Sequence, residues 1–360
     1  MANLDVTDWL DIQDTNATND KRFAELGLVD AVKESSAFTD YISQSAREQL
    51  SKASSLRNVK IPVLKDQTVS VVTTPGFNFI PSNLPESDQY SFTAVDLFTG
   101  FRHYPAQFAN NAMDAKQTKQ MVMKNVAYQL GVSVESLLTT VLESRKSQVW
   151  DYTSQYGYSS GGGTYTFNAG TDTLEINKAA QQETMFWDLD GMFADNELGG
   201  NLRYVANRGG FAVQKKEALK YGMSNDKNIA ALGLPDASRM HMTGNISAGA
   251  DIFNGFAFRD GAIGMIENFP YDFANGTEIN GKKWDITNVD LPFARMRANI
   301  YTNNEATDAT ALVGAGTDTN TIMTTFSEMA IWLRFYIVYR YNGDIANRAN
   351  DILKIKGLTT

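Results

Sequence analysis

Few side chains in this 360-residue chain could carry out acid–base or nucleophilic chemistry. The sequence has no cysteine and 2 histidines, His103 in the stretch FRHYP and His241 in RMHMT. Neither lies in a motif such as GxSxG that places a base near a nucleophile. A zinc site needs more nitrogen or sulfur ligands than these, and HExxH is absent. We expect both histidines to be hydrogen-bonded structural residues.

The carboxylates of the stretch WDLDGMFADNELGG are the other candidates. Asp188 and Asp190 would share one face of a strand and could bind a hard cation through oxygen, with Asp195 and Glu197 nearby. The spacing of an EF-hand loop is absent, so a polar turn that closes a helix is the simpler interpretation. A glycosidase pair stays open, because its two carboxylates can be distant in sequence. GxGxxG and GxxxxGK(S/T) loops do not occur.

Charge and hydropathy narrow the range of partners. The chain has 41 acidic and 32 basic residues and a net charge of -9, which disfavours tight binding of phosphate groups. The start of the chain lacks the basic and apolar regions of a signal peptide. The late apolar run from Met329 to Tyr339 is short and contains Arg334, so we expect no membrane partner. The clearest basic cluster is either a solvated helix face or an inter-subunit contact, and contains Lys215, Lys216, Lys220 and Lys227.

A long helix is the main element expected to position these side chains. Between Met113 and Trp150, apolar residues recur at helical spacing: Met123, Val126, Ala127, Leu130, Val134, Leu137, Leu138 and Val141. Such a helix would be about 55 Å long, which is more than a compact domain needs. Gly131 costs about 1 kcal/mol relative to alanine, so the pattern allows a kink there.

Alternating residues in 58–105 predict a long β-hairpin with a proline-rich tip. The alternation involves Val59, Ile61 and Val63 before the tip, and Thr93, Val95 and Leu97 after it. Because an isolated two-stranded ribbon is marginal in water, this hairpin should lie on the same chain or on a neighbour. Residues 1–24 are either a frayed acidic terminus or an arm that orders on a neighbour through Trp9 and Leu10.

The remaining elements are read from periodicity and turn signals. We expect short helices within 25–55, a helix and its exit over 174–198, a strand at 202–206, a turn at Asn207–Gly210 and a helix over 211–221. Further strands are expected at 255–258, 262–266, 282–289 and 328–341, with a last one near Ile352. Residues 159–163 and 304–320 read as loops. In the strand 328–341, one face would hold Ile331, Leu333, Phe335 and Ile337.

The order of these elements resembles the major capsid protein of tailed bacteriophages, which has the Hong Kong 97-type capsid fold. An arm, a short helix, a long hairpin and a spine helix precede an α/β region with a long late strand. Local patterns also resemble this family: VKIPV at 59–63, RYVANRGGFAVQKKEALKYG at 203–222, DLPFARMRANIY at 290–301 and YIVYRYNGDIANRANDILKIKG at 336–357.

The resemblance implies an α+β, Hong Kong 97-like capsid fold. Residues 1–35 would be the N-terminal arm and 56–107 the extended β-hairpin, or E-loop. Residues 108–185 and 326–360 would form the peripheral domain with the spine helix, and 186–325 the axial domain. The implied function is structural and not enzymatic: self-assembly into hexamers and pentamers of an icosahedral head that encloses double-stranded DNA. The implied location is the virion, after assembly in the host bacterial cytoplasm.

The implied partners are other copies of the chain, a portal, and cement or head-decoration proteins. A start at Met1 without a further N-terminal domain favours a separate scaffolding protein. The negative charge suggests that packaged DNA is contacted weakly. No catalytic, cofactor-binding or metal-binding residue is implied, and the Lys–Asn cross-link of some relatives is not carried over to Lys65. An encapsulin-type cellular shell, and a carbohydrate-active enzyme or lectin using Asp188 or Asp190, remain alternatives.

Overall fold

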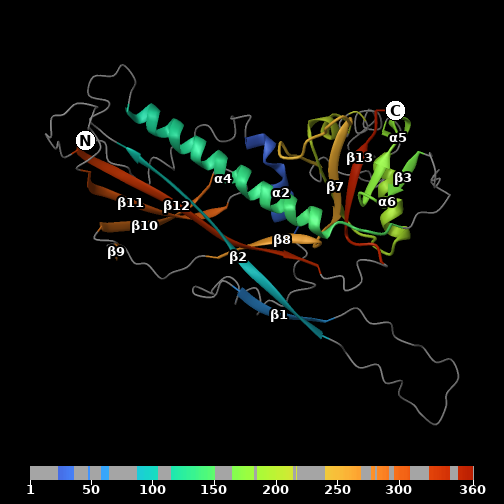
Figure 1. Ribbon diagram of the computed structural model, residues 1–360, viewed down its shortest axis with the longest axis horizontal. Helices are drawn as coiled ribbons and strands as arrows, with labels where there is room; N and C mark the ends of the chain where they lie inside the picture. Colours follow the sequence, from blue (N-terminus) through green and yellow to red (C-terminus); the bar gives the residue numbers. More distant parts are fainter. Residues whose placement is uncertain are drawn as a thin grey trace, which may run out of the picture.

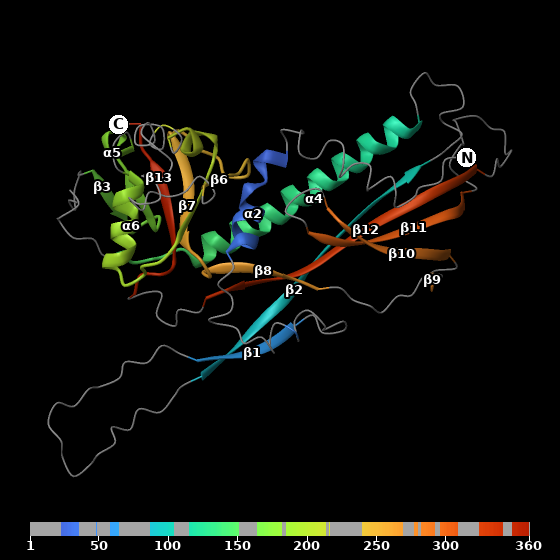
Figure 2. The same cartoon turned by 180° about the vertical axis from the view of Figure 1, so that it is seen from behind.

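The computed structural model describes residues 23–35, 48, 58–64, 87–103, 115–150, 164–181, 185–213, 216, 240–268, 277–279, 282–291, 296–308, 324–340 and 348–359. Several predicted features lie outside these ranges, namely the arm anchors Trp9 and Leu10, the hairpin tip, Lys65 and the glycine-rich run 159–163. The described residues form two β-sheets and a long helix (Figures 1 and 2), which confirms the predicted α+β class.

Seven of the described strands form the larger sheet, in the order β1-β2-β12-β11-β10-β9, with β8 also paired to β12. They are β1 (Asn58–Leu64), β2 (Ser87–His103), β8 (Ile263–Glu267), β9 (Thr277–Ile279), β10 (Lys282–Asp290), β11 (Arg297–Asp308) and β12 (Thr324–Tyr339). All their pairings are antiparallel. Residues 304–308, predicted to be part of a loop, belong to β11 because their backbone pairs with β12 beyond a register shift between Asn303 and Ala306.

The spine helix is confirmed as α4 (Ala115–Arg145), which lies along the larger sheet (Figure 1). It continues through Gly131 without a break. The buried residues on both sides of this glycine, including Ala127 and Val134, belong to one hydrophobic cluster. That shared burial outweighs the intrinsic cost of a glycine in a helix.

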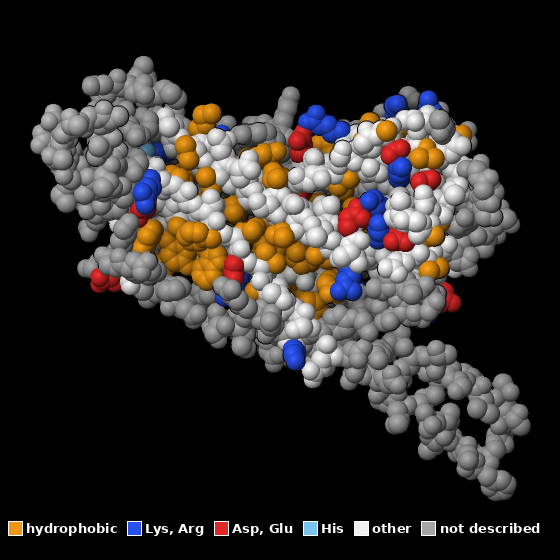
Figure 3. Space-filling view, viewed as in Figure 1, with side chains coloured by type: hydrophobic (Ala, Val, Ile, Leu, Met, Phe, Trp, Pro, Cys, Tyr) orange, Lys and Arg blue, Asp and Glu red, His pale blue; other side chains and the backbone are white. Residues whose placement is uncertain are grey.

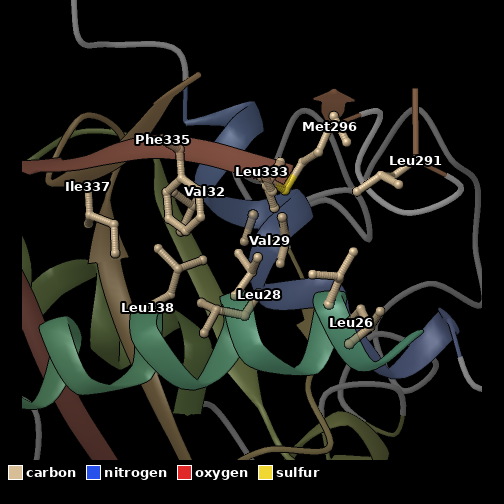
Figure 4. Packing of buried hydrophobic residues seen from close by; sticks show 14 of the residues in the cluster. Leu26, Leu28, Val29, Val32, Leu138, Leu291, Met296, Leu333, Phe335 and Ile337 are labelled. Atoms are coloured by element: carbon tan, nitrogen blue, oxygen red, sulfur yellow. The ribbon is translucent and has the colours of Figure 1, made fainter. Parts of the chain in front are cut away.

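The core between α4 and the larger sheet contains a second helix. A short 3-10 helix, η1 (Phe23–Glu25), leads into α2 (Gly27–Glu34), which lies between α4 and β12 in Figure 4. Val29 of α2, Leu138 of α4 and Phe335 of β12 are fully buried in one cluster. The predicted inward face of β12 is confirmed, because Ile331, Leu333 and Ile337 belong to the same cluster.

Six described strands form the smaller sheet, in the order β3-β4-β13-β7-β5-β6. They are β3 (Tyr165–Asn168), β4 (Thr173–Ile176), β5 (Leu202–Ala206), β6 (Met240–Met242), β7 (Phe253–Arg259) and β13 (Ile352–Gly357). The pairs β13–β4 and β5–β6 are parallel, and the others are antiparallel. Two helices accompany this sheet, α5 (Lys178–Gln181) and α6 (Met185–Asp195).

Two local predictions near this sheet are wrong. Residues 174–176, predicted to begin a helix, form strand β4 because they pair with both β3 and β13. Residues 208–213 are helical, so the segment predicted as a turn at Asn207–Gly210 already starts a helix. Asn207 accounts for this start, because its side-chain oxygen accepts the backbone N–H of Gly210, as an N-cap residue does.

The two sheets do not follow the predicted domain ranges. Strands β3, β4 and β13 come from 108–185 and 326–360, yet they share a sheet with β5, β6 and β7 from 186–325, because β13 pairs with β7. Conversely, β8 to β11 come from 186–325 and join β12 in the larger sheet. Which sheet a strand joins is decided by its pairing with strands that are distant in sequence. The division of the chain into domains remains a prediction.

Candidate self-association surface

Asp188 and Asp190 lie on helix α6, and the prediction that they share a strand face is wrong. Residues two apart on a helix do not face each other. The hydroxyl of Tyr165 on β3 donates to Asp188 Oδ2 over 2.5 Å, and the hydroxyl of Tyr204 on β5 donates to Asp190 Oδ1 over 3.0 Å. Each carboxylate therefore ties α6 to a different strand of the smaller sheet.

The other candidate chemical groups are dispersed. His103 ends β2 in the larger sheet and is buried, whereas His241 lies on β6 in the smaller sheet. Of the predicted lysine cluster, only Lys216 lies in the described part of the chain, and it is exposed. Among the described residues, no group of three or more His, Asp or Glu side chains could hold a metal ion. No described helix is long and apolar enough to cross a membrane.

The β1–β2 ribbon is the most extended described feature of the molecule. Strand β2 has 17 residues, and β1 pairs with its first part, from Asn58 opposite Thr93 to Leu64 opposite Ser87. The second part of β2, Ala94 to His103, pairs with β12. At about 3.4 Å per residue, β2 spans more than about 50 Å. The ribbon therefore leaves the body with β1 as an edge strand (Figures 1 and 2).

The root of the ribbon is fixed to the end of α4. Phe92 of β2 is buried, and its ring packs edge-on against Tyr339 of β12 at 5.9 Å between centroids. Arg145, the last residue of α4, stacks on the Tyr339 ring at 4.1 Å and donates to its hydroxyl over 2.7 Å. A cation over an aromatic face is stabilising, so this trio couples the ribbon to the spine helix.

The larger sheet carries aromatic residues on the face opposite α4. Trp332 of β12 and Phe98 of β2 are register partners, and alternation places both on the other side from Leu97 and Leu333, which pack in the core. Tyr301 of β11 lies 6.4 Å from Trp332 between ring centroids. Phe98 is 70% exposed, the largest exposed fraction of the exposed large hydrophobic residues in the described part of the chain.

Charged groups on the same face hold the aromatic side chains in place. Asp96 accepts a hydrogen bond from the Trp332 indole over 3.1 Å and forms an ion pair with Arg334 over 3.1 Å. Arg334 is itself buried and also faces the Trp332 ring at 5.6 Å. Figure 3 shows hydrophobic side chains in a band over the larger sheet. Exposed apolar side chains beside tryptophan, tyrosine and arginine residues are typical of protein interfaces.

Sequence reasoning predicted the ribbon, but it missed Phe98 as a surface residue. The ribbon was predicted from the alternation of Thr93, Val95 and Leu97, and this alternation gives no information about the other face of β2. The large residue at Phe98, which falls between Leu97 and Thr99 and so on the opposite face, was the signal that could have indicated a second apolar side.

No protein-family model and no curated protein matches the sequence. Solved structures do resemble the chain. One from Mycobacterium phage Che8 has a TM-score of 0.43 at 8% identity, covering 89% of this chain and 90% of that chain. The capsid asymmetric unit of cyanophage Pam1 has a TM-score of 0.44 at 10% identity, covering 84% and 86%. The capsid structure of cyanophage P-SCSP1u has a TM-score of 0.42 at 10% identity, covering 86% of each chain. The solved structures that this chain is similar to include phage capsids.

Proposed function

We propose that this chain is a major capsid protein that self-assembles into hexamers and pentamers of an icosahedral phage head enclosing double-stranded DNA. The β1–β2 ribbon carries the proposal. A two-stranded ribbon is marginally stable alone, yet β1 pairs with a part of β2 that no other described strand reaches. A neighbouring copy that packs on the ribbon would supply the missing contacts.

Contacts of this kind are heterologous, since the ribbon of one copy meets a different surface of the next. Such contacts generate rings when the rotation closes. The aromatic face with Phe98 and Trp332 is a suitable receiving surface, because burying a phenylalanine side chain is worth about 1.5–3 kcal/mol. Many weak contacts repeated in a closed shell add to a large total stability.

The domain roles follow as part of the same proposal. The resemblance implies an arm within 1–35 and an E-loop within 56–107. Of these ranges, α2 packs in the core and Ala94–His103 pairs with β12, so the arm is assigned to the residues before Phe23 and the E-loop to the residues before Ala94. The larger sheet with α4 forms the peripheral domain, and the smaller sheet with α5 and α6 forms the axial domain. This assignment moves β3, β4 and β13 from the peripheral to the axial domain. A scaffolding protein, a portal and cement proteins are the proposed partners, and the net charge of -9 suits an inner wall that contacts DNA weakly.

Electron microscopy and sedimentation of the purified protein test this function. We expect uniform polyhedral shells or rings of subunits. A variant with a shortened hairpin joins Leu64 directly to Ser87 by an Asn-Gly turn. The two residues lie opposite each other in the β1–β2 pair, so a two-residue turn can connect them. It should fold, with the thermal stability of the wild type, and fail to form shells. Discrete wild-type monomers under all assembly conditions would contradict the proposal and favour an enzyme or lectin, whereas shells that co-purify with an enzyme cargo would indicate an encapsulin.

A further inference from the structure

Glu135 is a fully buried carboxyl group in the middle of α4. It is the one charged residue of the stretch GVSVESLLT, which covers 131–139. Its Oε1 accepts the backbone N–H of Leu28 over 2.9 Å. Its Oε2 accepts the hydroxyl of Thr243 and the side-chain amide of Asn245, both over 2.7 Å. One carboxyl group therefore connects α4, α2 and the turn that follows β6.

Glu135 acts as the N-terminal cap of α2. The residue at the capping position of this helix is Leu26, which offers no side-chain hydrogen bond. The backbone N–H groups of Leu28 and Val29, which lack partners within the helix, are directed to Glu135 instead. A negative charge near a helix N-terminus is favourable, so these donors stabilise the ionised form.

The junction around Glu135 is tightly packed. A Cβ atom on Gly27 would lie 2.6 Å from the backbone oxygen of Met242, so glycine is what allows α2 to approach β6 this closely. Leu26 forms a β-bridge with Thr243, whose backbone N–H donates to Ala206 of β5. Because β5 and β6 belong to the smaller sheet, while α2 and α4 pack on the larger one, Glu135 lies where the two halves of the molecule meet.

Burial and hydrogen bonding act on this carboxyl group in opposite directions. Burial raises the pKa of Glu135 to about 7, although the donors from Thr243, Leu28 and Asn245 lower it in part. Most charged groups on the surrounding elements have partners of their own. The described pairs are Glu25 with Arg208, Lys33 with Glu267, and Arg203 with Asp260. The other titratable groups on α2 and β6 are Asp30, Glu34 and His241.

We propose that Glu135 is a proton-dependent latch that holds α2, α4 and the turn after β6 together when protonated and loosens this junction when ionised. A protonated Glu135 can donate to the Thr243 hydroxyl oxygen, which also accepts the backbone N–H of Asn245 over 3.1 Å. This function is a property of the subunit and does not depend on the capsid assignment.

The direction of the pH effect on the junction follows from the difference between the pKa of Glu135 in the closed and in the open junction. The pKa of Glu135 is about 7 in the closed junction and 4.5 where the group is exposed to water. The stabilisation is therefore fully present below the lower value and is lost as the pH rises through the upper one. For these two values, the opening equilibrium constant increases about tenfold between about pH 6 and about pH 8.

Hydrogen exchange at the Leu28 and Val29 amides tests the latch in the full chain. After correction for the intrinsic pH dependence of exchange, their protection factors should fall about tenfold between about pH 6 and about pH 8. In E135Q, which keeps the shape of the side chain and cannot titrate, the protection factors should not vary with pH.

Two control variants should behave as the wild type does. E143Q removes a half-buried carboxylate on the same helix that pairs with Lys354 and Lys146. H241Q removes the histidine of β6, which directly precedes Met242 and Thr243 at the junction. A flat wild-type profile, a fall that persists in E135Q, or a profile that H241Q flattens would each overturn the proposal. If E135Q fails to fold, a tenfold fall in both the wild type and H241Q still supports it.

Discussion

Tyr165 and Tyr204 bind, through their hydroxyl groups, the two aspartates that most resembled cation ligands in the sequence. Both tyrosines are fully buried, and each donates to a different carboxylate of α6. A buried hydroxyl group needs such an acceptor, because an unpaired one costs about 1–3 kcal/mol. At the residue scale, the acidic stretch is therefore explained by the attachment of a helix to a sheet.

Removing one of these hydroxyl groups should weaken that attachment. We expect Y165F to lower the free energy of unfolding by about 1–2 kcal/mol, since it leaves the Asp188 carboxylate without its hydrogen bond over 2.5 Å. Equilibrium urea unfolding measures the change. T166V, at a half-buried neighbour on the same strand, should stay within about 0.5 kcal/mol of the wild type. A Y165F protein as stable as the wild type would show that the hydroxyl contributes nothing.

Single residues also show where the sequence was informative and where it was not. The apolar stripe of α4 was predictable: Met123, Ala127, Leu130, Val134 and Leu138 are all buried. Glu135 was not predictable, because a lone charge beside an apolar stripe normally points to solvent. Its partners Leu28, Thr243 and Asn245 are 107 to 110 residues away, and no local pattern brings them together.

The periodicity of the sequence predicts the individual helices and strands here, but it does not predict how the strands assemble into sheets. The periodicity and turn signals that predicted β7, β8, β10 and β12 are local properties of the sequence. The parallel pairing of β13 with β4 joins residues near the C-terminal end of the chain to residues in its middle, such as Ile355 to Leu174. Such pairings depend on long-range packing, so no repeat or turn signal in the sequence announces them.

Helix α4 allows a test at the scale of one element, because it carries one large apolar residue in the core and another on its exposed surface. Leu138 is fully buried against α2 and β12, whereas Met121 is 61% exposed. L138A should lower the free energy of unfolding by about 2–5 kcal/mol, because it removes buried methyl groups and leaves a cavity.

M121A is the matched control and should change the stability by less than about 0.5 kcal/mol. Thermal and urea unfolding of both variants measure this difference. Equal losses in the two variants would mean that the two faces of α4 are not distinguished as buried and exposed.

At the scale of the whole molecule, the β1–β2 ribbon extends from the packed body, and no described strand of the body pairs with the part of β2 that pairs with β1. Arg145, Tyr339 and Phe92 fix the root of the ribbon to the spine helix, so a force on the ribbon would be transmitted to the body. A subunit of this form is suited to a lattice, in which the position of each ribbon depends on the neighbour that it contacts.

The exposed aromatic face provides the sharpest test of assembly. F98S removes the most exposed large hydrophobic residue of the described surface and leaves the core face of β2 unchanged. If Phe98 is buried by a neighbour, each contact loses about 1.5–3 kcal/mol, and the protein concentration needed for assembly rises about 10- to 100-fold. Light scattering against concentration measures this threshold.

The control for that experiment is V149S, at an apolar residue that is 37% exposed beyond the end of α4. It should assemble at the wild-type concentration, and both variants should keep the wild-type melting temperature, since Phe98 and Val149 lie outside both hydrophobic clusters of the subunit. An unchanged threshold in F98S would exclude the face of Phe98 and Trp332 as a contact between copies. Assembly would then depend on the ribbon edge at β1, where backbone groups pair instead of side chains.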